Sequence, residues 1–449
     1  MARPDRAISF SGAHWVRTPQ HQVMARSSPR LSGSFLLYKL HSVDSTQSVS
    51  FPDESDMNRT RAVPHQNTVF RQVAQRLPWA QVNRLIREHQ ADKGVRKLPT
   101  QQMLLTLLFA QFSGARSLRD IEAILQSEEA RRYHSGLCAV RRSTLADATA
   151  SRPVAVFTGV LAVLIPRLSG KFRRGVGDCV RLIDSTSLRL NALSGKWSRF
   201  SADLCGAKAH VVYDPDADCP LYLGITAANV NDITAAREMP IEPGATYVFD
   251  LGYYEFAWWA KLDEAACRIV TRLKSNTPLE VIETRPLADG ADNILADTIG
   301  FLPKRLARSR HNPMANAVRE IKVRIETGAV LRIVTNDLDA PATEIAALYK
   351  RRWAIELFFR WVKQTLQIRH FHGASENAVR IQIAVMLIAF VLIRLAHIAQ
   401  SAVESPTQFA RLIGATIIHR KPLDRLISRD RPHKPPAVQN HAQGCFTWA

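Results

Sequence analysis

The sequence predicts a mixed α/β protein, in which an all-α N-terminal domain precedes a mixed-sheet core that carries a strand-rich insertion. Three observations support this fold class. Apolar side chains recur at helical spacing over residues 65–153, the period changes to that of strands at about residue 178, and helical spacing returns after residue 342. The 449 residues suffice for two or three domains, and 46% hydrophobic residues suffice for sizeable cores.

The N-terminal third begins without periodicity and then becomes helical. Residues 1–64 are rich in Ser, Pro, Arg and Gln, so we expect a flexible leader, and Met57 would open a tidier domain. Residues 68–90 show helical spacing, but Pro78 should divide them into two helices. A buried helix is expected over residues 104–112.

Two short helices, over residues 117–126 and 143–150, form a candidate helix-turn-helix. A polar turn separates them, and Arg141 and Arg142 precede the second helix. In a helix-turn-helix the second helix enters the major groove of DNA, although such pairs are also common as simple packing units. We therefore predict that the helical domain at 65–153 binds DNA.

Strand-like segments and one short helix follow in the order strand, strand, strand, helix, strand, which is typical of a mixed α/β core. The segments are 180–190, 209–213, 221–226, 232–239 (the helix) and 247–249. The acidic stretch from Asp214 to Asp218 predicts a hairpin turn. It lacks the glycine and the final glutamate of a calcium-binding loop.

The second half of the chain predicts an insertion, two long helices and a tail. Strand-like segments at 268–273, 321–326 and 330–335 indicate a β-rich insertion at about 267–340. Helices are expected over 343–366 and 378–400. The catalytic domain should then cover 154–402, and a basic C-terminal tail, partly flexible, should cover 403–449.

The charge balance favours a polyanionic partner. Sixty Lys and Arg stand against forty Asp and Glu, which gives a formal net charge of +20. Cations placed on phosphates release condensed counterions, so this excess favours nucleic acid. Charge alone is also compatible with a protein that is merely basic.

Localisation follows from the cysteines and the apolar segments. The six cysteines are scattered without a Cys-x-x-Cys pair, which fits a reducing compartment. The apolar stretch 383–393 is too short to span a bilayer and should be a buried helix. The N-terminus lacks the pattern of a secretory signal. We expect a cytoplasmic protein, associated with the nucleoid when bound to DNA, and no membrane partner.

Two aspartates occupy equivalent places at the ends of predicted strands. Asp184 follows Val-Arg-Leu-Ile, and Asp250 follows Tyr-Val-Phe. Such positions are rigidly supported yet open to a ligand, which suits a metal site. The alternative is that each aspartate only caps the following turn.

A stripe of polar residues on the helix at 343–366 adds a third carboxylate. Tyr349, Arg352, Glu356 and Lys363 fall within an arc of about 60° at roughly 100° per residue. A salt-bridged surface helix could produce such a stripe. A single glutamate among many cations on an apolar helix fits a metal ligand flanked by phosphate clamps better.

Phosphodiester cleavage explains why these residue types occur together. The reaction needs an activated water or hydroxyl, a stabilised transition state and a neutralised leaving oxygen. Two hard cations about 4 Å apart supply all three, and oxygen ligands hold such ions well. Asp184, Asp250 and Glu356 could hold two Mg²⁺ ions, with Mn²⁺ able to substitute.

The motifs resemble those of a known family. Tyr349-x2-Arg352-x3-Glu356-x6-Lys363 matches the Y-(2)-R-(3)-E-(6)-K signature of insertion-sequence transposases of the IS-four group. The motifs around Asp184 and Asp250 resemble the first and second aspartate motifs of these aspartate–aspartate–glutamate (DDE) enzymes. The stretch from His65 to about residue 148 resembles the helical N-terminal domain of one branch, and the whole resemblance covers roughly residues 65 to 400.

The resemblance implies an RNase H-like core and metal-dependent cleavage and strand transfer at the ends of an insertion sequence. Asp184, Asp250 and Glu356 would be catalytic and bind metal, and Tyr349, Arg352 and Lys363 would contact terminal phosphates. The partners would be double-stranded DNA, both the terminal inverted repeats and the target, and we expect a dimer in the DNA complex. Some relatives stack a flipped base on a tryptophan of the insertion, but here residues 260–352 contain no tryptophan.

Three other functions were weighed. An inactive or repurposed transposase would bind DNA without cutting it, although all three acids are present. A covalent recombinase would use Tyr349 as its nucleophile, which leaves the spacing of Glu356 unexplained. A nucleotide-hydrolysing motor is disfavoured because the G-x4-G-K-[ST] motif does not occur.

Overall fold

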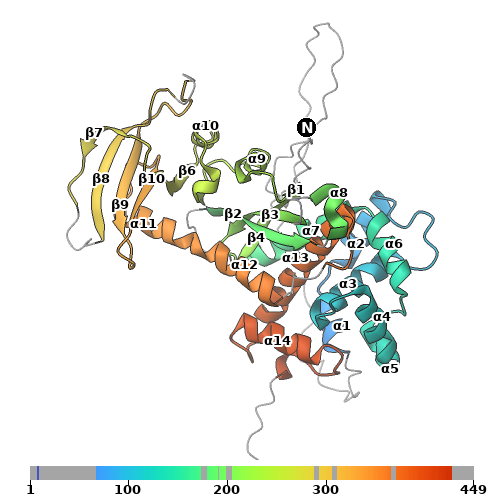
Figure 1. Cartoon of the computed structure of the whole chain (residues 1–449). Helices are drawn as coiled ribbons and strands as arrows, with labels where there is room; N and C mark the ends of the chain where they lie inside the picture. The colour runs from blue at the N-terminus through green and yellow to red at the C-terminus, as the bar shows by residue number, and fades with distance from the viewer. Residues whose placement is uncertain are drawn as a thin grey trace, which may run out of the picture.

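The computed structural model describes residues 8–9, 67–172, 179–190, 192–198, 205–287, 293–305, 311–365 and 371–426. Nearly all of the expected leader and the end of the expected tail lie outside the described residues. Within them, the predicted fold class is confirmed: a helical N-terminal region leads into a large mixed sheet with long helices packed on it (Figure 1).

The N-terminal region is built from short helices around a buried one. Pro78 separates the first two helices as predicted, and Ser117 caps the fourth by accepting a hydrogen bond from the backbone N–H of Asp120 at 3.1 Å. The helices are α1 Val69–Ala74, α2 Trp79–Glu88, α3 Thr100–Ser113, α4 Leu118–Ser127, α5 Glu129–Ser135, α6 Arg142–Ser151 and α7 Val154–Phe172.

The predicted helix-turn-helix is wrong in its central part. The segment expected to be a polar turn contains the helix α5. Because α5 is mostly charged, it has no apolar periodicity to reveal it. An i, i+3 pair between Glu129 and Arg132 and a left-handed glycine at its end, Gly136 with φ +70°, favour the helix instead. Helices α4 and α6 still pack against each other, with α5 beside α4.

The centre of the molecule is a five-stranded sheet of RNase H-like topology. Its strand order is β4-β3-β2-β5-β6; β2, β3 and β4 are antiparallel neighbours, whereas β5 runs parallel to β2 and β6 parallel to β5. The strands are β2 Val180–Leu190, β3 Cys205–Asp214, β4 Cys219–Ala227, β5 Thr246–Phe249 and β6 Arg268–Arg272. Every core segment predicted before residue 250 is present.

Short helical segments connect these strands. They are η2 Ala192–Ser194, α8 Gly195–Ser198, α9 Asp232–Ala236, η3 Leu251–Tyr253 and α10 Phe256–Glu264, and the two-residue strand β1 Ile8–Ser9 pairs with β4 at the sheet edge. The connection β4–α9–β5 brings the chain back to the middle of the sheet beside β2.

The insertion extends the sheet beyond β6 and contains more strands than predicted. Its antiparallel strands follow in the order β10-β9-β8-β7. They are β7 Glu280–Thr284, β8 Ile294–Phe301, β9 Val318–Arg324 and β10 Val330–Thr335. The sequence predicted β9 and β10 but missed β7 and β8. Because β6 belongs to the core sheet, the insertion begins after Arg272 instead of at about residue 267.

The helix predicted over 343–366 is in fact two helices. These are α11 Ala342–Arg351 and α12 Trp353–Thr365, and the helical hydrogen-bond pattern is interrupted at Arg352. There the N–H of Arg352 bonds to the carbonyl of Tyr349 and the N–H of Ile355 to that of Arg352, which are the i to i+3 bonds of a tighter turn. Neither glycine nor proline occurs there, so local sequence gave no sign of the break.

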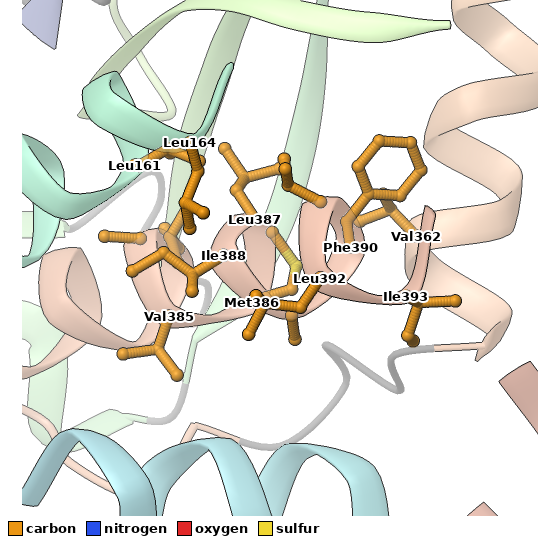
Figure 2. Packing of buried hydrophobic residues seen from close by; sticks show 14 of the residues in the cluster. Leu161, Leu164, Val362, Val385, Met386, Leu387, Ile388, Phe390, Leu392 and Ile393 are labelled. Atoms are coloured by element: carbon orange, nitrogen blue, oxygen red, sulfur yellow. The ribbon is translucent and has the colours of Figure 1, made fainter. Parts of the chain in front are cut away.

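The long helix α13 Glu376–Ile398 runs through the core. Figure 2 shows Leu161 and Leu164 of α7 and Val362 of α12 gathered along it. The prediction of a buried helix is confirmed, but the argument from length was wrong. Among the described residues α13 is long and apolar enough to cross a membrane, as is α6 with the start of α7 if that bent pair counts as one span. Within α13, however, 83% of the apolar window is buried inside the protein.

The described residues after α13 include a further helix. Residues 403–449 were expected to form a basic tail, yet α14 Pro406–Thr416 is a helix, followed by η5 Leu423–Arg425. Phe409 and Ile413 are buried, and α14 packs on α12, α13 and the N-terminal helices α1 and α3. The tail therefore joins the N-terminal region to the core (Figure 1).

Candidate active site

The two aspartates lie side by side because their strands are parallel neighbours. Ile183 of β2 is paired with Phe249 of β5, so Asp184 and Asp250 are the next residue on each strand. Each carboxylate is oriented locally: Asp184 Oδ1 accepts the N–H of Ser185 at 2.7 Å, and Asp250 Oδ1 accepts that of Gly252 at 2.8 Å. The sequence placed both aspartates at strand ends: Asp250 does follow the end of β5, whereas Asp184 lies inside β2, which continues to Leu190.

The glutamate comes from helix α12, which packs on the face of the sheet to which Asp184 points. Asp184 is opposite Val211 in the β2–β3 pair, and side chains alternate along a strand, so Asp184, Val211 and Tyr213 share one face. Phe358 of α12 stacks on Tyr213 with ring centroids 4.9 Å apart. Glu356 precedes Phe358 by two residues on α12 and lines a pocket together with Asp184 of β2.

A single arginine joins the two acids. Arg352 Nη2 donates to Glu356 Oε1 at 2.6 Å, and its Nη1 lies 3.8 Å from Asp184 Oδ2. The guanidinium is 5.8 Å from the ring centroid of Tyr349, at the end of α11. The predicted polar stripe therefore persists across the break between α11 and α12.

A pocket of about 380 Å³ opens between β2 and α12. Two of the three predicted acids and one predicted phosphate clamp reach it. Its lining consists of Asp184, Ser185, Thr186, Glu356, Phe359, Arg360, Lys363 and Gln364. Arg352, Tyr349 and Asp250 are not part of the lining. The β2 wall contributes the carboxylate of Asp184, and the α12 wall contributes Glu356 together with the cations Arg360 and Lys363, a combination that suits metal ions and a phosphate.

The carboxylates repel one another. Burial, together with the nearby charges of Asp250 and Glu356, raises the pKa of Asp184 to about 6, against the opposing effects of the Ser185 N–H and of Arg352. Burial lowers the pKa of Lys363, and the charge of Asp184 opposes that shift. A bound cation would relieve this repulsion.

The donor set fits a hard divalent cation, although the distances do not form a closed cage. Asp184, Asp250 and Glu356 offer only oxygen donors, the type that Mg²⁺ and Mn²⁺ prefer. In the described part of the chain, no three His, Cys, Asp or Glu residues lie close enough together to hold one ion. Arg352 lies between Asp184 and Glu356 and neutralises them in their present positions.

The apolar residues of α12 divide into two sets that the sequence did not separate. Ile355, Phe358 and Val362 are buried, whereas Trp353 is 49% exposed and Leu357 46% exposed. The guanidinium of Arg360, which lines the pocket, lies 5.8 Å from the ring centroid of Trp353. The exposed Trp353 therefore lies beside a residue that lines the pocket. The insertion contributes no tryptophan, because residues 260–352 contain none.

The acidic hairpin turn between β3 and β4 is structural. Each aspartate is held by an arginine from another element. Asp214 pairs with Arg181, Asp216 with Arg351, and Asp218 with Arg394. The plain turn predicted there is confirmed, and its ion pairs fix the helices α11 and α13 to the sheet.

The sequence analysis did not identify a further carboxylate that lies near Asp184 and Asp250. Asp232, the first residue of α9, accepts a hydrogen bond from Ser185 Oγ at 2.7 Å and pairs with Lys208 Nζ at 3.1 Å. His210 is fully buried, and burial lowers its pKa to about 4. The available signal was the occurrence of Lys208 and His210 within an otherwise apolar strand.

Two family models match parts of the chain. Residues 175–392 match the family described as "Transposase DDE domain", and residues 65–138 match a domain of unknown function, DUF4372. The piggyBac transposase synaptic complex with hairpin DNA resembles the fold at a TM-score of 0.43 with 10% identity, covering 78% of this chain and 80% of that one.

Bacterial relatives are named as transposases. A putative transposase, y4zB of Sinorhizobium fredii, is 41% identical over 299 residues, 66% of this chain and 82% of that protein. A probable transposase for insertion sequence element IS5377 of Geobacillus stearothermophilus is 28% identical over 270 residues, 58% of this chain and 68% of that protein. The chain therefore belongs to the DDE transposases of insertion sequences, in the IS-four group, enzymes of DNA transposition.

Proposed function

We propose that Asp184, Asp250 and Glu356 are the catalytic, metal-binding residues of this transposase. DDE transposase domains use divalent metal ions, and we propose two Mg²⁺ ions here, with Mn²⁺ able to replace them. The observation that carries the proposal is the convergence of Asp184 and Glu356 on one pocket, with Arg352 between them.

The protein's part in the reaction is to hold and orient. When bound, the metal ions lower the pKa of the attacking water or 3′-hydroxyl and neutralise the leaving oxygen. The parallel strands β2 and β5 hold Asp184 and Asp250 rigidly, and α12 brings Glu356 to the pocket that Asp184 lines. For a metal to bind, Arg352 must exchange its carboxylate partners for another anion.

The terminal phosphates of the element are suitable new partners for Arg352. A guanidinium forms bidentate bonds with phosphate as readily as with carboxylate. Lys363 lines the same pocket, and Tyr349 supports the guanidinium from the side. We propose that Arg352, Lys363 and Tyr349 position the phosphate next to the scissile bond.

DNA is the partner of this family. We propose that the helical domain at 65–153 contacts the terminal inverted repeats, that the catalytic domain at 154–402 also receives target DNA, and that two copies pair the element ends. The net charge of +20 supports a long DNA footprint. A cytoplasmic location, with association to the nucleoid through DNA, follows from this activity.

A terminal nicking assay tests the proposal. The purified protein is incubated with a duplex carrying the element's own end, in Mg²⁺ or in EDTA. We expect a Mg²⁺-dependent nick at the terminus that is lost in Asp184→Asn and in Glu356→Gln, while both variants still bind the duplex. Cleavage retained in either variant would refute the assignment. Binding without cleavage by the wild-type protein, in Mg²⁺ and Mn²⁺ alike, would indicate a repurposed DNA-binding protein.

A further inference from the structure

Asp232 lies on the opposite face of the sheet from Asp184 and makes several contacts there. Ser185 and His210 are paired across β2 and β3, so both point away from the α12 face. Asp232 Oδ1 accepts from Ser185 Oγ at 2.7 Å and lies 3.1 Å from Lys208 Nζ. His210 Nδ1 is 3.6 Å from the same oxygen, too far for a hydrogen bond, and has no other partner.

The other oxygen of Asp232 faces the second aspartate motif. A Cβ atom added to Gly252 would lie 3.2 Å from Asp232 Oδ2 and 2.9 Å from Asp250 Oδ1. Gly252 donates its backbone N–H to Asp250 Oδ1, so this glycine belongs to the turn that orients Asp250. Only a residue without a side chain lets the two carboxylates approach the same peptide so closely.

The carboxylate of Asp232 lies between the residue that follows Asp184 and the turn that follows Asp250. One oxygen contacts the residue after Asp184, and the other lies against the turn after Asp250. Lys208 also donates to the carbonyl of Val230 at 3.0 Å, which fixes the loop just before α9. The side chain of Asp232 is only 23% exposed, and its charge is compensated by Lys208.

We propose that Asp232 is a positioning residue, which sets the separation of Asp184 and Asp250 by bridging Ser185 and the Gly252 turn. The inference rests on the proposed function, because it assumes that the two aspartates hold metal. A site for hard cations tolerates little error in ligand geometry, and loss of an outer partner of a ligand commonly costs 10- to 100-fold in metal affinity or activity.

Metal affinity in the DNA complex tests this role without relying on cleavage. The full chain is bound to a pre-cleaved element end and titrated with Mn²⁺, and free Mn²⁺ is followed by electron paramagnetic resonance. Asp232→Ala should raise the Mn²⁺ concentration for half-occupancy roughly tenfold. Asp232→Asn should raise it less, because its amide oxygen still accepts from Ser185. The dissociation constant for the DNA should stay within about twofold of wild type for both variants.

A matched control separates positioning from general damage. Asp297→Asn removes a carboxylate charge from a buried pair with Arg319 in the insertion, away from both strand ends. It should lower thermal stability but leave Mn²⁺ affinity unchanged. If Asp297→Asn and Asp232→Ala weaken Mn²⁺ binding equally, Asp232 has only a structural role.

Coupling to Ser185 gives a second measurement that holds even if Asp232→Ala folds poorly. If Asp232 acts through Ser185, Ser185→Ala should weaken Mn²⁺ binding. The Ser185→Ala, Asp232→Asn double variant should then bind Mn²⁺ no more weakly than whichever single variant binds it more weakly. Additive effects would overturn the proposal, as would Mn²⁺ affinities within twofold of wild type in all three variants. The proposed function itself fails separately, if Asp184→Asn leaves Mn²⁺ binding by the complex unchanged.

Discussion

Arg352 donates to Glu356 at 2.6 Å while the same guanidinium lies 3.8 Å from Asp184, so one cation joins a helix carboxylate to a strand carboxylate. The three side chains are only 17%, 30% and 18% exposed. Partial burial makes such pairs stronger than surface ion pairs and makes a missing partner costly. The pair therefore stabilises the acids in the free protein, and its rearrangement is a step that the DNA phosphate can drive.

Replacing Arg352 tests that exchange. Arg352→Ala should reduce single-turnover cleavage of an end duplex by about 100-fold or more, because the phosphate loses a bidentate partner. Arg352→Lys should not restore the rate, since an ammonium lacks the planar fork. The adjacent Arg351 pairs with Asp216 in the β3–β4 turn, so Arg351→Ala should stay within a few-fold of wild type. An equal loss in both alanine variants would contradict the specific role of Arg352.

The raised pKa of Asp184 predicts a stability effect with a definite sign. A carboxyl whose pKa is about 6 when folded and 3.8 when unfolded disfavours the folded protein above about pH 4, and fully so above pH 6. Asp184→Asn should therefore stabilise the metal-free, DNA-free protein at pH 7.5 by about 1–3 kcal/mol. Denaturant unfolding at several pH values checks this. The gain should shrink between pH 6 and pH 4, and a constant difference over that range would show that charge is not its cause.

Lys363 should contribute one phosphate contact. Lys363→Ala is expected to weaken DNA binding and to reduce the slope of log K against log salt concentration by about 1. Fluorescence anisotropy of a labelled end duplex measures this slope. The salt concentration should vary from about 50 to about 300 mM, because a slope needs a range of that width to be defined. Lys261 on α10 is a suitable control, because α10 packs on the opposite face of the sheet. Equal slopes for wild type and Lys363→Ala would mean that Lys363 meets no phosphate.

Tyr349 distinguishes the metal-dependent mechanism from a covalent one. The residue is 9% exposed, and burial raises the pKa of its hydroxyl, against the effect of Arg352, which makes it a poor nucleophile. Tyr349→Phe keeps the ring beside Arg352 and should retain cleavage within about tenfold of wild type. A covalent recombinase would lose all activity with this change. It would also form a protein–DNA adduct in the wild type that survives denaturation, which gel electrophoresis would reveal.

Local sequence predicted the parts of the site whose placement follows from local rules. Asp250 directly follows the buried strand β5, and Asp184 follows a buried apolar run within β2, so the local apolar pattern fixes the position of each aspartate whatever its long-range partners are. Spacing of three and four along a helix similarly brought Arg352 and Glu356 together. The succession of the core elements along the chain could be predicted for the same reason, since each strand has its own apolar pattern.

Tertiary structure alone decided the features that depend on distant partners. The break at Arg352 occurs without glycine or proline, and the arginine there reaches Asp184, far away in the sequence. Helix α5 and strands β7 and β8 lack the apolar periodicity that reveals an element, and β7 is exposed along its whole length. These elements form because neighbouring segments supply hydrogen bonds and packing contacts, which cannot be predicted from the residues of the element itself.

Asp232 shows the difference most clearly. Its sequence neighbourhood is that of an ordinary short helix, yet its carboxylate contacts Ser185, which lies 47 residues earlier in the chain. The sequence by itself predicted the three acids as a group, the spacing of Tyr349, Arg352, Glu356 and Lys363, and the order of the core strands along the chain, because apolar runs and helical spacing are local properties. Only the folded sheet decided which polar residues lie behind the aspartates, because that depends on the pairing of β2 with β3 and β5.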